Sequence, residues 1–160
     1  MNKFTALIGT VAALAMPFAA NAQTFSGNAS GVSGSANLEQ TLNVTCDVAF
    51  DGTVNTGTNT VSITSPSVSP GSLSCIFVVP YGTWSASAVP GDATKIDVTM
   101  GANTVANDPC YGTVRADWDN DLKILTITEK PLPAVDQTPP VGQTCTIHSA
   151  EIYIPNLNLS

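Results

Sequence analysis

The sequence predicts an all-β fold, either an antiparallel β-sandwich or a partly open barrel of about eight short strands, with two disulfides. Three observations support this prediction. Apolar residues alternate with polar ones over short runs, and no helical stripe of apolar residues follows the first segment of the chain. Clusters of Gly, Pro, Asn and Asp separate the runs. The 4 cysteines are an even number, which suits two disulfides.

Residues 1–22 have the pattern of a bacterial signal peptide. Lys3 provides a positive start, an apolar run follows, and Ala20-Asn21-Ala22 supplies the small residues of a cleavage site. The apolar run is too short to span the hydrocarbon core of a bilayer. We therefore expect cleavage near Ala22, secretion to the periplasm or beyond the cell, and no transmembrane anchor in the mature chain.

Residues 23–37 are rich in Gly and Ser and predict a flexible leader. An assembly arm that adds a strand to a neighbouring sheet is the alternative. Residues 38–160 are then expected to form one disulfide-stapled β-domain.

The expected strands of this domain each place alternate apolar residues on one face. In chain order these faces are Leu42, Val44, Cys46, Val48 and Phe50; Val61 and Ile63; Cys75, Phe77 and Val79; Ile96, Val98 and Met100; Leu125 and Ile127; and Ile152 and Ile154.

The cysteines divide the chain into two similar units, each with a strand, a turn, a second strand and a Pro-rich loop between its cysteines. In an antiparallel meander, strands that flank a third run the same way and start at the same end. This favours pairing Cys46 with Cys75 and Cys110 with Cys145 among the three possible connectivities. Zinc binding is the rival, but the chain has no CxxC pair and a single histidine, His148.

The charge balance excludes several classes of partner. The chain has 5 basic and 12 acidic residues and a net charge of −7, so it lacks the basic patches that bind nucleic acid or anionic lipid.

Catalysis is not expected. The chain has no G-x-S-x-G motif whose serine His148 could activate, and His148 alternates with the apolar residues of its expected strand. No cofactor is expected. Asp117, Asp119 and Asp121 are best interpreted as a hairpin tip, with a weak calcium site left open.

The aromatic residues of the segment CIFVVPYGTW have two interpretations. Core packing between the walls of the fold is the favoured one. The alternative is an exposed apolar contact surface around Tyr81 and Trp84, which would meet hydrocarbon, lipid or a protein partner.

Three motifs together resemble the small secreted bacterial proteins called activators of alkane oxidation. They are Cys75 before Val79-Pro80, then Cys110-Tyr111-Gly112-Thr113-Val114 followed by Trp118, then Cys145-Thr146-Ile147. The resemblance implies a non-enzymatic exported accessory protein that promotes growth on alkanes by aiding hydrocarbon contact or dispersion. Its partners would be a hydrocarbon or lipid surface, or other copies of itself. The alternative function is a structural or adhesive subunit, pilin-like or part of a biofilm matrix.

Overall fold

The computed structural model describes residues 22–69, 71–104, 108–136 and 142–160, so the predicted signal peptide lies outside the described residues except for Ala22. These residues form eleven antiparallel strands and one short 3-10 helix, η1. In chain order the elements are β1 (Phe25–Gly27), β2 (Ala29–Glu39), β3 (Asn43–Asn55), β4 (Thr60–Ser69), η1 (Leu73–Phe77), β5 (Val78–Pro80), β6 (Ser85–Val89), β7 (Asp92–Thr104), β8 (Cys110–Asp119), β9 (Ile124–Leu132), β10 (Cys145–Tyr153) and β11 (Leu157–Leu159).

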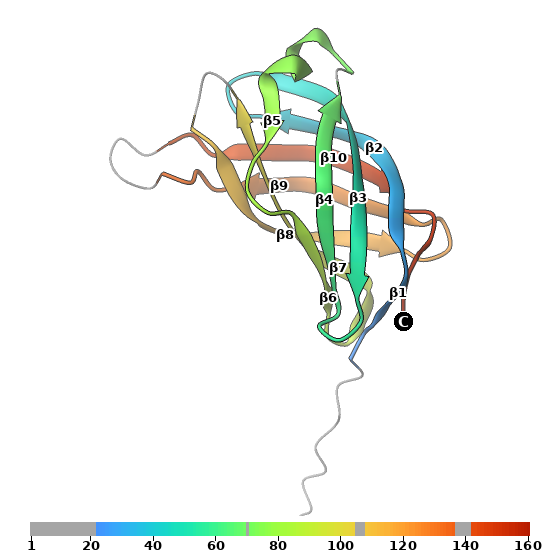
Figure 1. Cartoon of the computed structure of the whole chain (residues 1–160). Coiled ribbons are helices and arrows are strands. Elements are labelled where there is room, and N and C mark those ends of the chain that lie inside the picture. The colour runs from blue at the N-terminus through green and yellow to red at the C-terminus, as the bar shows by residue number, and fades with distance from the viewer. Residues whose placement is uncertain (1–21, 70, 105–107, 137–141) are drawn as a thin grey trace, which may run out of the picture.

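Eight strands form a closed barrel in the order β7-β6-β4-β3-β2-β10-β9-β8, and β8 pairs back onto β7. The short strand β5 pairs with the end of β7, beyond the part of β7 that pairs with β6. In Figure 1, β3 and β4 run across β9 and β10 of the opposite wall. The predicted all-β fold is confirmed, and the barrel is closed.

The ladder between β7 and β8 closes the barrel. It pairs eight residues of each strand, from Lys95 opposite Asp117 to Ala102 opposite Cys110. Side chains on its outer face also join across the strands. Lys95 forms an ion pair with Asp117, and a second, bidentate ion pair joins the strands two residues further along. Opposed charges of this kind stabilise a sheet modestly and disfavour other registers.

Buried and exposed residues alternate along the strands, with the period of two residues that the sequence predicts. On β8, Val114, Ala116 and Trp118 are buried and the residues between them are exposed. On β10, Ile147 and then Ala150 point inward, because a β-bulge shifts the register between Ile147 and Ser149. All eight barrel strands contribute to the main core.

The expectation of a flexible leader at residues 23–37 is wrong. This segment forms β1 and most of β2, and β2 pairs with both β3 and β10. β1 pairs with β11, and together they cover one end of the barrel with Phe25, Leu157 and Leu159, all buried. Small residues lie in β2 because the structure is crowded there: a Cβ on Gly34 would lie 2.2 Å from the carbonyl oxygen of Glu151. Since β2 is paired on both sides within its own chain, it is not a donor arm.

Both predicted disulfides are confirmed, Cys46–Cys75 and Cys110–Cys145. The first joins β3 to η1 and, with Val78 and Ala102, forms a second small core. The second joins the start of β8 to the start of β10 at the same end of the barrel.

The expected strand face of Cys75, Phe77 and Val79 is also wrong. Residues 73–77 form η1, and β5 begins only at Val78. Cys75 and Val78 are buried, whereas Phe77 and Val79 are 51% and 52% exposed. At the end of η1 the backbone N–H of Val78 donates to the carbonyl oxygen of Cys75, three residues earlier, and this tight turn places both residues on the inner side.

Replacing Phe25 with Ala should lower the free energy of unfolding by about 3–5 kcal/mol, the usual cost of deleting a buried phenylalanine ring. Urea denaturation of the protein measures this. The exposed neighbour Ser26 provides the control, and S26A should change stability by less than about 0.5 kcal/mol. An F25A variant as stable as the wild type would mean that β1 does not close the barrel.

Candidate functional site

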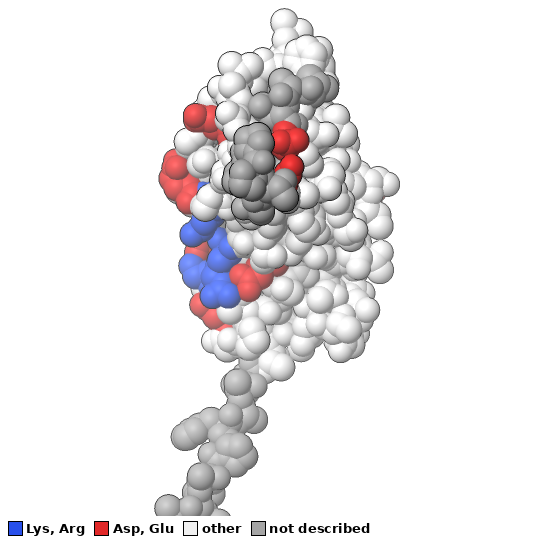
Figure 2. All heavy atoms as spheres, turned by 90° about the vertical axis from the view of Figure 1, so that its left-hand side faces the viewer, with Lys and Arg blue, Asp and Glu red and all other residues white. Residues whose placement is uncertain are grey.

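One side of the barrel is built from a segment without any charged residue. Residues 52–91 contain no Asp, Glu, Lys or Arg, and they supply the end of β3 and all of β4, η1, β5 and β6. Figure 2 shows the charged side chains gathered on one side of the molecule, while the other side of that view and its top are white. We call residues 52–91 the uncharged segment.

An apolar tip lies at one end of the barrel, where η1 forms the top of Figure 1, and most of it comes from the uncharged segment. The tip consists of exposed large apolar side chains from η1, from β5 and from the turn between β2 and β3. These are Leu42, Leu73, Ile76, Phe77 and Val79, which are between 51% and 86% exposed. Leu42 and Val78 line one small pocket, which joins the turn to β5. A group of exposed apolar side chains at one place on a surface is typical of a contact site.

The tip is fixed to the barrel on its inner side. Cys75 in η1 is bonded to Cys46 of β3 and is completely buried. Gly71 packs against the backbone of β3, where a Cβ would lie 3.2 Å from the carbonyl oxygen of Thr45. Because one side of η1 is anchored by the disulfide, Leu73 and Ile76 are held facing outward.

Tyr81 and Trp84 do not form the exposed surface that one interpretation of the sequence expected. Trp84 is 6% exposed, and its Nε1–H donates to the carbonyl oxygens of Tyr81 (3.2 Å) and Gly101 (3.1 Å). With its polar atom satisfied, the indole ring can be buried in the core. Tyr81 packs edge-on against Tyr111 at a ring separation of 6.2 Å, so it braces the loop between β5 and β6.

The interior of the barrel holds a cavity of about 60 Å³. Its lining is apolar throughout and comes from both ends of the barrel, with Ala29 and Leu157 near β11 and Leu38 and Val68 near η1. An unfilled volume of this size lowers stability by on the order of 1.4 kcal/mol.

Of the three aspartates at and after the end of β8, Asp117 and Asp119 have structural roles. Asp117 pairs with Lys95, and Oδ1 of Asp119 accepts the backbone N–H groups of Asp121 and Leu122, at 2.9 Å each. This is the turn geometry that Asp favours. Among the described residues, no group of three or more His, Cys, Asp or Glu is arranged to hold a metal ion.

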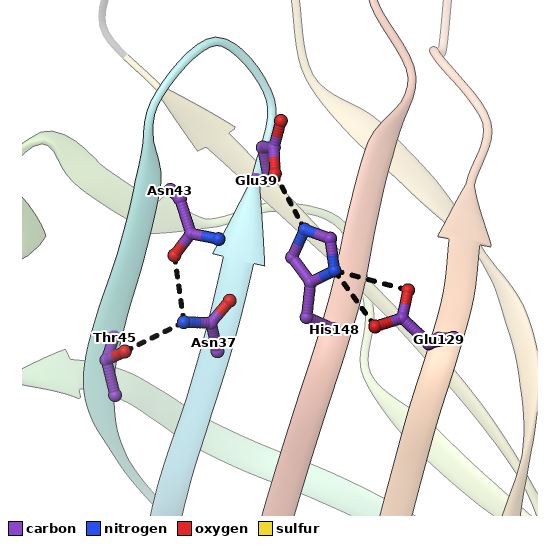
Figure 3. A network of polar contacts seen from close by, with 6 residues as sticks. All are labelled: Asn37, Glu39, Asn43, Thr45, Glu129 and His148. Atoms are coloured by element: carbon purple, nitrogen blue, oxygen red, sulfur yellow. Dashed lines mark hydrogen bonds and ion pairs between the residues drawn. The ribbon is translucent and has the colours of Figure 1, made fainter.

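His148 lies at the bulge of β10 and bridges two carboxylates on the outside of the barrel (Figure 3). Its Nε2 is 2.7 Å from Glu39 of β2, and its Nδ1 is 3.1 Å from Glu129 of β9. Hydrogen bonds that the ring donates to the carboxylates, that to Glu39 first and that to Glu129 second, raise the pKa of His148. With a carboxylate at each ring nitrogen, His148 links β10 to β2 and β9 and is not paired with a nucleophile. We call Glu39, His148 and Glu129 the clasp.

Comparison with known families identifies the family of the chain. A model of the family described as alkane oxidation protein activator, PraA/PraB-like, matches residues 1–159. The chain belongs to this family. No curated protein and no solved structure matches the chain.

The alkane oxidation activator family is named for an activating role and not for an enzymatic reaction, which agrees with the resemblance seen in the sequence. The two disulfides indicate an oxidising compartment, such as the periplasm or the cell exterior. In the described ranges, no helix is long and apolar enough to cross a bilayer.

The sequence contained one unused signal for the apolar tip of this alkane oxidation activator. Leu73, Ile76 and Phe77 have the i, i+3, i+4 spacing of a helical face. The segment is too short for that spacing to stand out against the strand pattern around it.

The clasp predicts a pH-dependent contribution to stability. Because the pKa of His148 is higher in the folded chain than its ordinary value of 6.5, the contribution is fully present below pH 6.5 and is lost as pH rises through the folded-state pKa. An NMR titration of the single histidine should give a pKa that falls in E39Q. The control D121N removes the same charge at the exposed turn after β8 and should leave that pKa unchanged. Equal pKa values in wild type and E39Q would contradict the clasp.

Proposed function

We propose that this protein is a secreted, non-enzymatic accessory factor that promotes bacterial growth on alkanes by contacting hydrocarbon through its apolar tip. The exposed tip on the uncharged segment carries the proposal. Family membership supports the link to alkane use, and the disulfides and the signal-peptide pattern support secretion.

The tip suits a hydrocarbon surface for two physical reasons. Each large apolar side chain that leaves water gains up to about 1.5–3 kcal/mol, so the tip supplies on the order of several kcal/mol. The second reason is that residues 52–91 carry no charge. Charged groups lose hydration when they approach an apolar phase, and the uncharged segment avoids this cost.

Anchoring of η1 adds to both effects. Because Cys46–Cys75 holds the helix in place, the tip loses little conformational freedom when it meets the hydrocarbon. Less entropy is then lost on binding, which strengthens adsorption for a given apolar area.

Replacing Leu73 and Phe77 together with Ser should weaken adsorption of the purified protein to hexadecane droplets by about tenfold or more, because much of the exposed apolar area is removed. The matched control is L122S/Y153S, which removes two apolar side chains that are 61% and 49% exposed but lie outside the tip. Adsorption is measured as the protein left in the aqueous phase. Equal adsorption of the two double variants would overturn the role of the tip.

In cells, deleting the gene should slow growth on hexadecane and leave growth on a soluble carbon source unchanged. Complementation with wild type or L122S/Y153S should restore growth on hexadecane, and L73S/F77S should not. Equal growth of the deletion strain on both carbon sources would remove the proposal. Large assemblies of the wild-type protein in size-exclusion chromatography, lost in L73S/F77S, would favour the structural or adhesive subunit instead.

A further inference from the structure

The cavity inside the barrel has the chemistry of a binding site for hydrocarbon. Every lining side chain is apolar. The one polar atom of Trp84 is occupied by the carbonyl oxygens of Tyr81 and Gly101. A sugar, a nucleotide or an ionised headgroup would lose its hydration there without gaining hydrogen bonds. The lining therefore selects an aliphatic or aromatic hydrocarbon group.

The size of the cavity selects between these two. An apolar cavity that admits benzene has a volume of about 150 Å³, whereas this one measures about 60 Å³. Benzene has six carbon atoms, so the larger cavity provides about 25 Å³ for each of them. At that volume per carbon, this cavity has room for about two methyl or methylene groups. Its lining residues extend from Leu157 at one end of the barrel to Val68 at the other, so an unbranched chain fits it better than a ring.

The barrel wall has a weak place beside this cavity. β4 pairs with β6 only over Thr60–Ser62, and one further bond joins Ile63 N–H to the carbonyl oxygen of Trp84 (3.0 Å). Beyond Ile63, no strand pairing joins β4 to β5 within the described residues, although the two strands are neighbours. Pro66 lies in this part of β4 and has no N–H to donate, which is typical of a strand edge. We call this place the β4–β5 seam.

The seam connects the apolar tip to the cavity. Val68 of β4 lines the cavity and also packs on the small core of Cys46, Cys75 and Val78 directly beneath η1. On β5, the next residue, Val79, belongs to the exposed tip. Packed apolar side chains therefore continue from the tip, through the small core beneath η1, to the interior. Met100, which also lines the cavity, has a flexible side chain that can move to admit a guest.

We propose that the barrel interior binds the end of a single linear aliphatic chain, which enters through the β4–β5 seam below the tip. The apolar lining and the volume of the cavity indicate an aliphatic ligand. The choice of an alkane over other aliphatic compounds rests on the function proposed above. The remainder of the chain stays at the seam and the tip. The protein would then withdraw single chains from a hydrocarbon phase in addition to adsorbing to it.

The test uses the mature protein and two soluble probes, n-hexane below saturation and sodium octanoate below its micelle concentration. Two-dimensional NMR should show contacts from the terminal methyl group of each probe to Ile63, Val68 and Met100. Contacts confined to the tip would overturn the proposal. Binding of octanoate without binding of hexane would overturn the assignment to alkanes.

A cavity-filling variant provides the matched test. Ala86 of β6 and Val98 of β7 both line the cavity and face each other across the two strands. A86V/V98I should keep or raise the melting temperature and weaken hexane binding by about tenfold or more, because space for two or more buried methylene groups is lost. The control S87V adds apolar volume on the neighbouring position of β6, which is not part of the lining, and should bind hexane normally.

The outcomes separate the two proposals. If A86V/V98I binds hexane as the wild type does, the cavity is not the site, whatever the droplets show. If A86V/V98I loses hexane binding but still adsorbs to droplets, and L73S/F77S loses droplet adsorption, the cavity and the tip act as two sites. If A86V/V98I proves unstable, M100A provides the opposite change. It enlarges the cavity and should bind hexane more tightly, and unchanged or weaker binding would count against the proposal.

Discussion

The ladder between β7 and β8 is the constraint on which the rest of the structure depends. Without it the sheet would be open, with its apolar face in water and two unpaired edges, which is a liability for any sheet protein. Closure buries that face against itself and defines an interior, and the outer face of the ladder carries ion pairs at Lys95–Asp117 and Arg115–Asp97. The barrel thus carries ion pairs on the ladder that closes it. The β4–β5 seam, in contrast, is uncharged and unpaired, so the wall differs in both chemistry and strength around its circumference.

The parts of the fold that follow from local rules were predictable from the sequence. Alternation at Ile96 and Val98, or at Leu125 and Ile127, places these residues in the core because a strand has a period of two. The disulfide pairing followed from the repeated unit and the antiparallel order. The failures arose where tertiary contacts override local composition. A Gly- and Ser-rich segment became β2 because close packing against β10 requires small residues, as at Gly34.

The candidate site was harder to predict than the fold, for a related reason. Exposure of Phe77 and burial of Trp84 depend on where the chain turns, and the turn is made by η1 and the Cys46–Cys75 bond together. In a strand, residues two apart lie on the same face, whereas in a 3-10 helix residues three apart do. Changing from one geometry to the other therefore exchanges which residues face inward and which face outward. The favoured interpretation, core packing, holds for Trp84. The alternative placed an exposed apolar surface at Tyr81 and Trp84, whereas such a surface lies at η1 and Val79 in the same stretch of chain. The cavity has no local signal at all, since it is the space that side chains from eight strands leave between them.

The pairing of β1 with β11 also has a consequence for how the protein folds. Residues 24 and 160 exchange backbone hydrogen bonds, at 2.7 and 3.1 Å, and β2 pairs with β10 across most of the sequence. Contacts between segments so distant in the chain form slowly, because a long loop must close before they contribute. The barrel cannot be completed from an incomplete chain. For the export proposed above, this means that the final structure can assemble only after the whole chain has reached the far side of the membrane.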